Sequence, residues 1–197
     1  PTLARFGTKE AKDKILPDAL AGRSIGAYAF TEPGAGSDLT QIRSQAVEKD
    51  DHWILNGTKI FITNGARADF VLVLAKTDAS KGYEGYTTFV VETKSEGFSV
   101  ARTLSKLGWH SSDTAELVFE NVKVPKSMVL GEVGKGWLQA MQSLEWERLM
   151  LSLTALAGAR QCLEDTITYV NDRKLFNRRV ADFDYTKELI ASFWSKL

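Results

Sequence analysis

The chain has 197 residues, of which 44% are hydrophobic and 25% are charged, as in an ordinary globular protein. Basic and acidic residues both number 25, so no overall basic excess favours nucleic acid or an anionic membrane surface. Cys162 is the only cysteine, and His52 and His110 lie far apart in the sequence. A disulfide within the chain and a thiolate cluster are therefore excluded, and we expect no metal site and no membrane span.

Residues 1–23 are expected to be helical. Thr8 is a candidate N-cap, and residues 10–16 fit one or two helical turns. Pro17 and Gly22 are expected to interrupt this helix.

Residues 24–130 are typical of β-structure, with short apolar runs separated by turn signals. The expected strands cover residues 24–30, 51–64, 70–76, 87–92, 97–102 and 115–124. Within residues 51–64, Asn56-Gly57 predicts a two-residue hairpin turn that divides the segment into two strands. This spacing favours a sandwich or barrel over a parallel α/β sheet.

Residues 131–197 change to a helical period, with helices predicted from residue 137 to about 173 and from 185 to 197. Two long helices cannot bury their apolar faces alone, so we expect partners beyond Leu197 or on another subunit. The first residue is Pro1 and the chain closes inside a helical pattern, which suggests a piece of a longer polypeptide. The predicted fold class is α+β, with an antiparallel β-barrel or sandwich between helical regions and an incomplete C-terminal bundle.

The string YAFTEPGAGSD occupies residues 28–38. A β-prone run meets a Pro-Gly turn whose glycines let the backbone approach a ligand closely, although a plain loop between strands fits equally well. A Rossmann fingerprint is excluded because Leu39 stands where the third glycine belongs.

Glu147 is a candidate general base on the long helix. Its neighbours on the same helix face are mostly apolar: Leu144, Met150, Leu151 and Thr154. Desolvation among such groups raises a carboxyl pKa towards the range that suits a base. An ion pair within the helix or between subunits is the alternative.

Residues 28–38 resemble the flavin-binding signature of the acyl-CoA dehydrogenase family, and the strings at 61–65 (FITNG) and 107–125 resemble its middle β-domain. The resemblance implies FAD as cofactor, with Phe61 shielding one face of the ring and Thr63 near flavin N5. Ser37 would contact both the flavin and the thioester substrate. The cofactor-binding residues that it implies in this region are Tyr28, Phe30, Thr31, Gly36, Ser37, Phe61, Ile62 and Thr63.

The resemblance also bears on the base. Most members carry the catalytic glutamate late in the C-terminal domain, beyond the part matched here, whereas isovaleryl and long-chain types carry it in a Glu-Arg-Leu context that residues 147–149 match. Glu145 and Arg148 would lie near the CoA moiety. Leu138 is a further substrate-binding candidate, although packing in a helical core fits it better.

Residues 172–177 resemble a family segment whose arginine reaches the FAD pyrophosphate of a partner subunit, which implicates Arg173 and Phe176. Asn177 replaces the usual glycine, and Asp184 stands where glutamine is usual, so the contact at Asp184 is in doubt.

The resemblance divides the chain into the end of an N-terminal helical domain (1–23), a β-domain for flavin and acyl-CoA (24–130) and the first helices of a C-terminal domain (131–197). It implies α,β-dehydrogenation of an acyl-CoA, an electron-transferring flavoprotein as partner and a homodimer or homotetramer. The compartment would be the cytoplasm in a bacterium and the mitochondrial matrix in a eukaryote. The alternatives are an acyl-CoA oxidase-like flavoenzyme and a non-catalytic CoA-binding or assembly module.

Overall fold

The computed structural model describes residues 1–197, and the predicted α+β class is confirmed. The chain forms two compact units, Pro1–Ser143 and Leu144–Leu197, which are described in turn. None of the helices combines the length and hydropathy that crossing a bilayer requires.

The first unit begins with two helices, α1 (Thr2–Phe6) and α2 (Lys9–Leu20). The predicted cap is confirmed, because the Thr8 hydroxyl accepts a hydrogen bond from the amide of Ala11 at 3.1 Å. The interruption expected at Pro17 is wrong, since α2 continues through it. A proline costs a helix one backbone hydrogen bond, which this helix tolerates close to its end.

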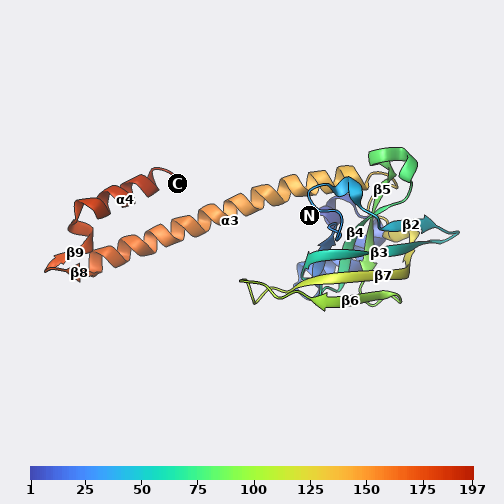
Figure 1. Ribbon diagram of the computed structural model, residues 1–197, viewed down its shortest axis with the longest axis horizontal. Helices are drawn as coiled ribbons and strands as arrows, with labels where there is room; N and C mark the ends of the chain where they lie inside the picture. The colour runs from blue at the N-terminus through green and yellow to red at the C-terminus, as the bar shows by residue number, and fades with distance from the viewer. The chain divides into compact units, whose positions relative to one another are not determined.

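Seven strands form one sheet in the first unit (Figure 1). They are β1 (Gly26–Ala29), β2 (Gln45–Glu48), β3 (His52–Thr63), β4 (Phe70–Lys76), β5 (Tyr86–Glu92), β6 (Phe98–Thr103) and β7 (Thr114–Pro125). The pairs β2–β3, β3–β7, β6–β7 and β4–β5 are antiparallel. Strands β1 and β2 instead pair in parallel with β4.

The hairpin turn predicted at Asn56-Gly57 is wrong, because β3 runs without a break through both residues. The turn that joins β2 to β3 lies earlier, where the amide of Lys49 donates to the carbonyl of His52. Gly57 is required for another reason: a Cβ there would lie 2.1 Å from the Ser44 hydroxyl oxygen. The local turn preference of the dipeptide is overridden by pairing with β2 and β7.

A β-bulge near the end of β3 changes which side chains face the core. Lys59 pairs with Leu117 and Ile62 with Ala115, so β3 has one residue more than β7 in this interval. Before the bulge the odd-numbered positions of β3 are buried, and after it the even-numbered ones are. Phe61 and Thr63 are thereby placed on the outer face, because a shift of one residue exchanges the two faces of a strand.

The core of the first unit lies between the sheet and the helices that cover it. Phe89 at its centre makes an edge contact with Trp53, with ring centroids 5.5 Å apart. Both β4 and β5 are buried along nearly their whole length, which explains their continuous apolar sequences.

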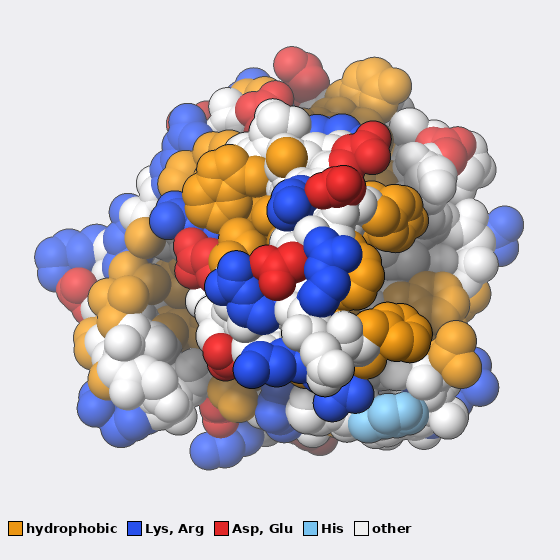
Figure 2. All heavy atoms as spheres, turned by 90° about the vertical axis from the view of Figure 1, so that its left-hand side faces the viewer, with side chains coloured by type: hydrophobic (Ala, Val, Ile, Leu, Met, Phe, Trp, Pro, Cys, Tyr) orange, Lys and Arg blue, Asp and Glu red, His pale blue; other side chains and the backbone are white.

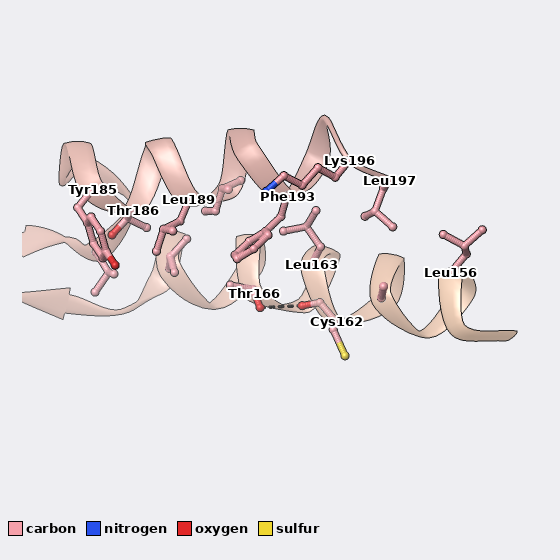
Figure 3. Close-up of a pocket in the computed structure, with 14 residues that line it drawn as sticks. Leu156, Cys162, Leu163, Thr166, Tyr185, Thr186, Leu189, Phe193, Lys196 and Leu197 are labelled. Atoms are coloured by element: carbon pink, nitrogen blue, oxygen red, sulfur yellow. Dashed lines mark hydrogen bonds between the residues drawn. The ribbon is translucent and has the colours of Figure 1, made fainter. Parts of the chain in front are cut away.

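The second unit contains the longer part of α3 (Gly136–Asp172), which begins in the first unit, together with a two-stranded hairpin of β8 (Lys174–Leu175) and β9 (Arg178–Arg179) and helix α4 (Asp184–Trp194). An apolar groove of about 760 Å³ lies between α3 and α4 (Figure 3). The Phe193 side chain of α4 points towards Leu163 and Thr166 of α3, and Tyr185 lines the same groove near the start of α4. The view in Figure 2 shows further hydrophobic side chains exposed among charged ones.

Candidate active site

The candidate site of the first unit is built where the chain leaves β1 and passes β3. The amide of Ile60 donates to the carbonyl of Thr31 at 2.9 Å, which brings the motif at 28–38 beside the bulge of β3. Two segments that are distant in the sequence are therefore joined through their backbones. The predicted neighbours Thr31 and Phe61 lie on these joined segments.

Phe61 is the most unusual residue of this site. Its φ is 61°, in the left-handed region that costs an L-residue about 1–2 kcal/mol. Its ring is nevertheless 63% exposed, so little apolar burial compensates for the strain. Strained backbone that presents an exposed aromatic ring is typical of a site that contacts a ligand.

Three hydroxyl groups in this region have no hydrogen-bond partner within the chain. They belong to Thr31, Ser37 and Thr63, which are half-buried, exposed and exposed, respectively. Gly36 leaves space beside the first of them, because an added Cβ would approach only the Thr31 methyl group, at 3.9 Å. An exposed ring and three available hydroxyls fit a planar, polar cofactor such as a flavin.

Other predicted cofactor-binding residues are more enclosed. The hydroxyl of Tyr28 hydrogen-bonds that of Thr2, and Phe30 packs edge-on against the Tyr28 ring at 5.6 Å. The side chain of Ile62 is buried in the core, which leaves its backbone as the part available to a ligand.

Sequence reasoning missed two charged residues here, Glu32 and Lys59. Lys59 is fully buried, and its ammonium lies 2.8 Å from the Glu32 carboxylate. Burial lowers the pKa of Lys59 to about 8, against the attraction of Glu32. For Glu32, desolvation raises the pKa, but Lys59 and donated hydrogen bonds outweigh it and hold the pKa below its ordinary value. Lys59 occupies an odd-numbered position of β3, like the buried Trp53 and Leu55, and this alternation is the signal that could have revealed its burial.

Asp113 fixes the turn that follows Thr63. Its carboxylate accepts the amide of Ala66 at 2.8 Å and lies 2.9 Å from Nε of Arg67, while its carbonyl accepts the amide of Asn64. These contacts support a structural role for Asp113 as a turn residue.

The candidate catalytic and CoA-binding residues lie on α3. Leu138, in the first unit, is 55% exposed within this chain, so both its substrate-binding role and its packing in a helical core stay predictions. Glu145, Glu147 and Arg148 belong to the second unit and are exposed. Partial desolvation nevertheless raises the pKa of Glu147, the direction expected from its apolar neighbours.

Arg173 and Phe176 lie at the β8–β9 hairpin of the second unit. Phe176 and Asn177 have φ values of 50° and 60°, so they form the two-residue turn, with the Phe176 side chain 89% exposed. Asparagine tolerates this conformation better than most residues, which explains how it substitutes for glycine. Asp184 begins α4, where a carboxylate favours the helix N-terminus, and pairs with Lys187 at 3.1 Å.

The groove between α3 and α4 is separate from these residues. Its lining includes none of the predicted catalytic, substrate-binding or cofactor-binding residues. Its apolar character instead fits a surface that packs against further protein.

Comparison with known proteins identifies both halves of the sequence. Residues 27–122 match the family described as acyl-CoA dehydrogenase, middle domain, and residues 134–197 match acyl-CoA dehydrogenase, C-terminal domain. The mouse (Mus musculus) long-chain specific acyl-CoA dehydrogenase is 43% identical over 97% of this chain and 45% of its own length. Potato (Solanum tuberosum) isovaleryl-CoA dehydrogenase is 40% identical over 99% of this chain and 47% of its own length.

The fold agrees with the sequence. A crystal structure of an acyl-CoA dehydrogenase from Geobacillus kaustophilus has a TM-score of 0.90 and 42% identity, and covers 100% of this chain and 52% of that one. The chain thus spans about half the length of the curated relatives it matches. It belongs to the acyl-CoA dehydrogenase family, whose cofactor is FAD, and carries the middle domain together with part of the C-terminal domain.

Proposed function

We propose that this chain is part of an FAD-dependent acyl-CoA dehydrogenase that removes hydrogen from the α and β carbons of an acyl-CoA thioester. Three parts are proposed within it: the end of an N-terminal helical domain (1–23), a flavin- and substrate-binding β-domain (24–130) and the start of the C-terminal helical domain (131–197). The observation that carries the proposal is the exposed, strained Phe61 beside the motif at 28–38.

The flavin would be held by the residues around the bulge of β3. Phe61 offers a flat apolar surface, Thr31 and Thr63 offer hydroxyl groups, and the backbone of Ile62 lies between them. When bound, FAD supplies the acceptor for the hydride that leaves the β carbon. Arg173 and Phe176 are proposed to contact the FAD of a partner subunit in a homodimer or homotetramer.

Glu147 is proposed to remove the α-proton, which the thioester carbonyl makes acidic. A carboxylate whose pKa is raised by desolvation is a stronger base than an ordinary glutamate, which supports this role. Ser37, Leu138, Glu145 and Arg148 are proposed to bind the substrate. Electrons would pass to an electron-transferring flavoprotein, in the cytoplasm of a bacterium or the mitochondrial matrix of a eukaryote.

The test uses the full-length protein and its Glu147→Gln variant. Both are mixed anaerobically with isovaleryl-CoA and palmitoyl-CoA, and the flavin absorbance is followed. We expect the wild type to bleach with one of the two substrates and the variant to keep its FAD without bleaching. Normal flavin reduction in the variant would remove Glu147 from the role of base.

Two further outcomes separate the alternatives. Rapid reoxidation of the reduced flavin by dioxygen would favour an acyl-CoA oxidase-like enzyme. A colourless full-length protein that takes up no FAD would favour a non-catalytic CoA-binding or assembly module.

A further inference from the structure

Lys59 is an ammonium group inside the sheet of the first unit, with a side chain that is 0% exposed. Its Nζ donates to the carbonyl of Phe30 at 3.1 Å, to the carboxylate of Glu32 at 2.8 Å and to the carbonyl of Leu74 at 2.7 Å. An ammonium group has three protons, so these contacts use its full donor capacity. Burying it unpaired would be costly, and here every proton has an acceptor.

The ammonium occupies a gap in the backbone pairing. On the edge of β4 opposite β5, β1 pairs as far as Val73, and β2 pairs only at Lys76. Between these two points the carbonyl of Leu74 accepts from Lys59 instead of from a strand. The segment 30–44, which contains the TEPGAGSD motif, leaves and re-enters the sheet at this gap.

Glu32 closes the same segment at both ends. Its carboxylate accepts the amides of Arg43 at 2.6 Å and Ser44 at 3.0 Å, in addition to the ammonium of Lys59. The Glu32 carboxylate therefore binds Arg43 and Ser44 at the end of the segment. It also binds Lys59, which donates to Phe30 at the beginning of the segment. The intervening residues, Ser37 among them, form a loop of fixed span.

Lys59 also lies directly before the bulge that exposes Phe61 and Thr63. Its side chain binds Phe30 and Glu32, while the next residue, Ile60, binds the carbonyl of Thr31. Three consecutive residues of the motif are thus attached to two consecutive residues of β3. Replacing a buried ion pair with apolar side chains is often neutral or stabilising, so stability alone does not explain a charged group at this position.

We infer that Lys59 and Glu32 are positioning residues, which set the distance between the loop carrying Thr31 and Ser37 and the bulge carrying Phe61 and Thr63. This inference rests on the proposed function, because those four residues are the proposed flavin contacts. Neither Lys59 nor Glu32 needs to touch the cofactor.

The first experiment measures amide hydrogen exchange in the chain with no ligand added. In Lys59→Met we expect exchange at Ile60, Arg43 and Ser44 to accelerate at least about tenfold, as the loss of hydrogen bonds to a charged group implies. The amides between β4 and β5 should stay within about twofold of the wild type. The matched control is Lys126→Met, which removes an exposed lysine 2.7 Å from Glu48 and should leave all these amides unchanged.

A chemical rescue keeps the inference testable if Lys59→Met folds poorly. Lys59→Cys is made in a Cys162→Ser background and alkylated while unfolded, either with bromoethylamine or with bromopropane. The two products have side chains of the length of lysine, and only the first carries an ammonium. We expect slow exchange at Arg43 and Ser44 to return with the first product alone.

Three results would overturn the inference: equal acceleration of all amides in Lys59→Met, no acceleration anywhere, or equal rescue by the neutral propyl group. FAD binding to the full-length protein separates this inference from the proposed function. A loosened loop with unchanged FAD affinity would refute positioning and leave the dehydrogenase proposal intact. A wild type that binds no FAD would refute the proposed function, whatever the exchange data show.

Discussion

Phe61 offers a quantitative test of the link between backbone strain and ligand binding. At an ordinary strand position, glycine is less stable than alanine by roughly 0.5–1 kcal/mol, because glycine loses more conformational freedom on folding. At position 61, with a φ of 61°, alanine must also adopt a left-handed conformation that costs about 1–2 kcal/mol. We therefore expect Phe61→Gly to be as stable as Phe61→Ala or more stable.

The size of the change from the wild type follows from the exposure of the ring. Full burial of a phenylalanine side chain contributes about 1.5–3 kcal/mol, so a ring that is 63% exposed contributes roughly 0.5–1 kcal/mol. In Phe61→Gly this loss and the entropy of glycine are offset by the relief of strain. The expected change in the free energy of unfolding is within about 1 kcal/mol of zero.

Phe89 is the matched control because it lies in the same sheet with 0% exposure. Phe89→Ala should lower the free energy of unfolding by about 3–5 kcal/mol, as for other fully buried rings. Urea-induced unfolding followed by circular dichroism measures all three variants. In the full-length protein, Phe61→Gly should also bind FAD more weakly than the wild type, while remaining about as stable.

Two results would refute this reasoning. If Phe61→Gly is clearly less stable than Phe61→Ala, the residue is not held under strain. If either variant loses as much stability as Phe89→Ala, the ring serves the core and not a ligand.

Three further predictions concern other parts of the chain. The pKa of Glu32 is lowered in the folded state, so its contribution to stability is present above the ordinary glutamate pKa and is lost as the pH falls through the folded value. At neutral pH, Glu32→Gln should therefore unfold at a lower urea concentration than the wild type, and this difference should disappear in acid. A difference that does not depend on pH would contradict this prediction. Asn177→Ala should destabilise the β8–β9 hairpin by about 1–2 kcal/mol, whereas Asn177→Gly should not. Hydrogen exchange of the Val180 amide, which donates to the carbonyl of Arg173 at 2.8 Å, measures this difference. Equal effects of the two substitutions would exclude a left-handed turn. The 197-residue chain alone should bind FAD weakly in a fluorescence titration, because it spans about half the length of its relatives, and tight stoichiometric binding would refute this.

The elements that the sequence predicted well have strong local signals. Strand β4 has the predicted bounds, Phe70–Lys76, because a short, continuous apolar run is typical of a strand that is buried on both faces. The long helix α3 was predicted within a residue at each end, and the cap at Thr8 was identified from its own side-chain chemistry.

Three of the failures have a common physical origin in contacts between distant segments. Asn56-Gly57 has a strong local turn preference, but its pairing with β2 and β7 decides its conformation. Strand β2 was missed because its four residues are mostly exposed and carry little apolar signal. The burial of Lys59 depends on carbonyl groups at positions 30 and 74, which no local pattern connects.

The sequence indicated which segments form the candidate site, but not the directions in which their side chains point. The strings at 28–38 and 61–65 indicated which segments would meet, and the hydrogen bond between Ile60 and Thr31 joins them. The outward direction of Phe61 did not follow from alternation, which would have placed it with Trp53 and Leu55 on the buried face. The assignments of Glu147 and the other ligand-contacting residues stay predictions that the experiments above address.

The bulge in β3 makes this strand sensitive to length as well as to composition. Alternation along a strand is a signal with a period of two, and one extra residue between Lys59 and Ile62 shifts its phase by half a period. If alternation simply continued from Lys59 without the bulge, an aromatic ring and a threonine would turn inward and an isoleucine would be exposed. Among related sequences, substitutions in this interval should therefore be far more frequent than insertions or deletions.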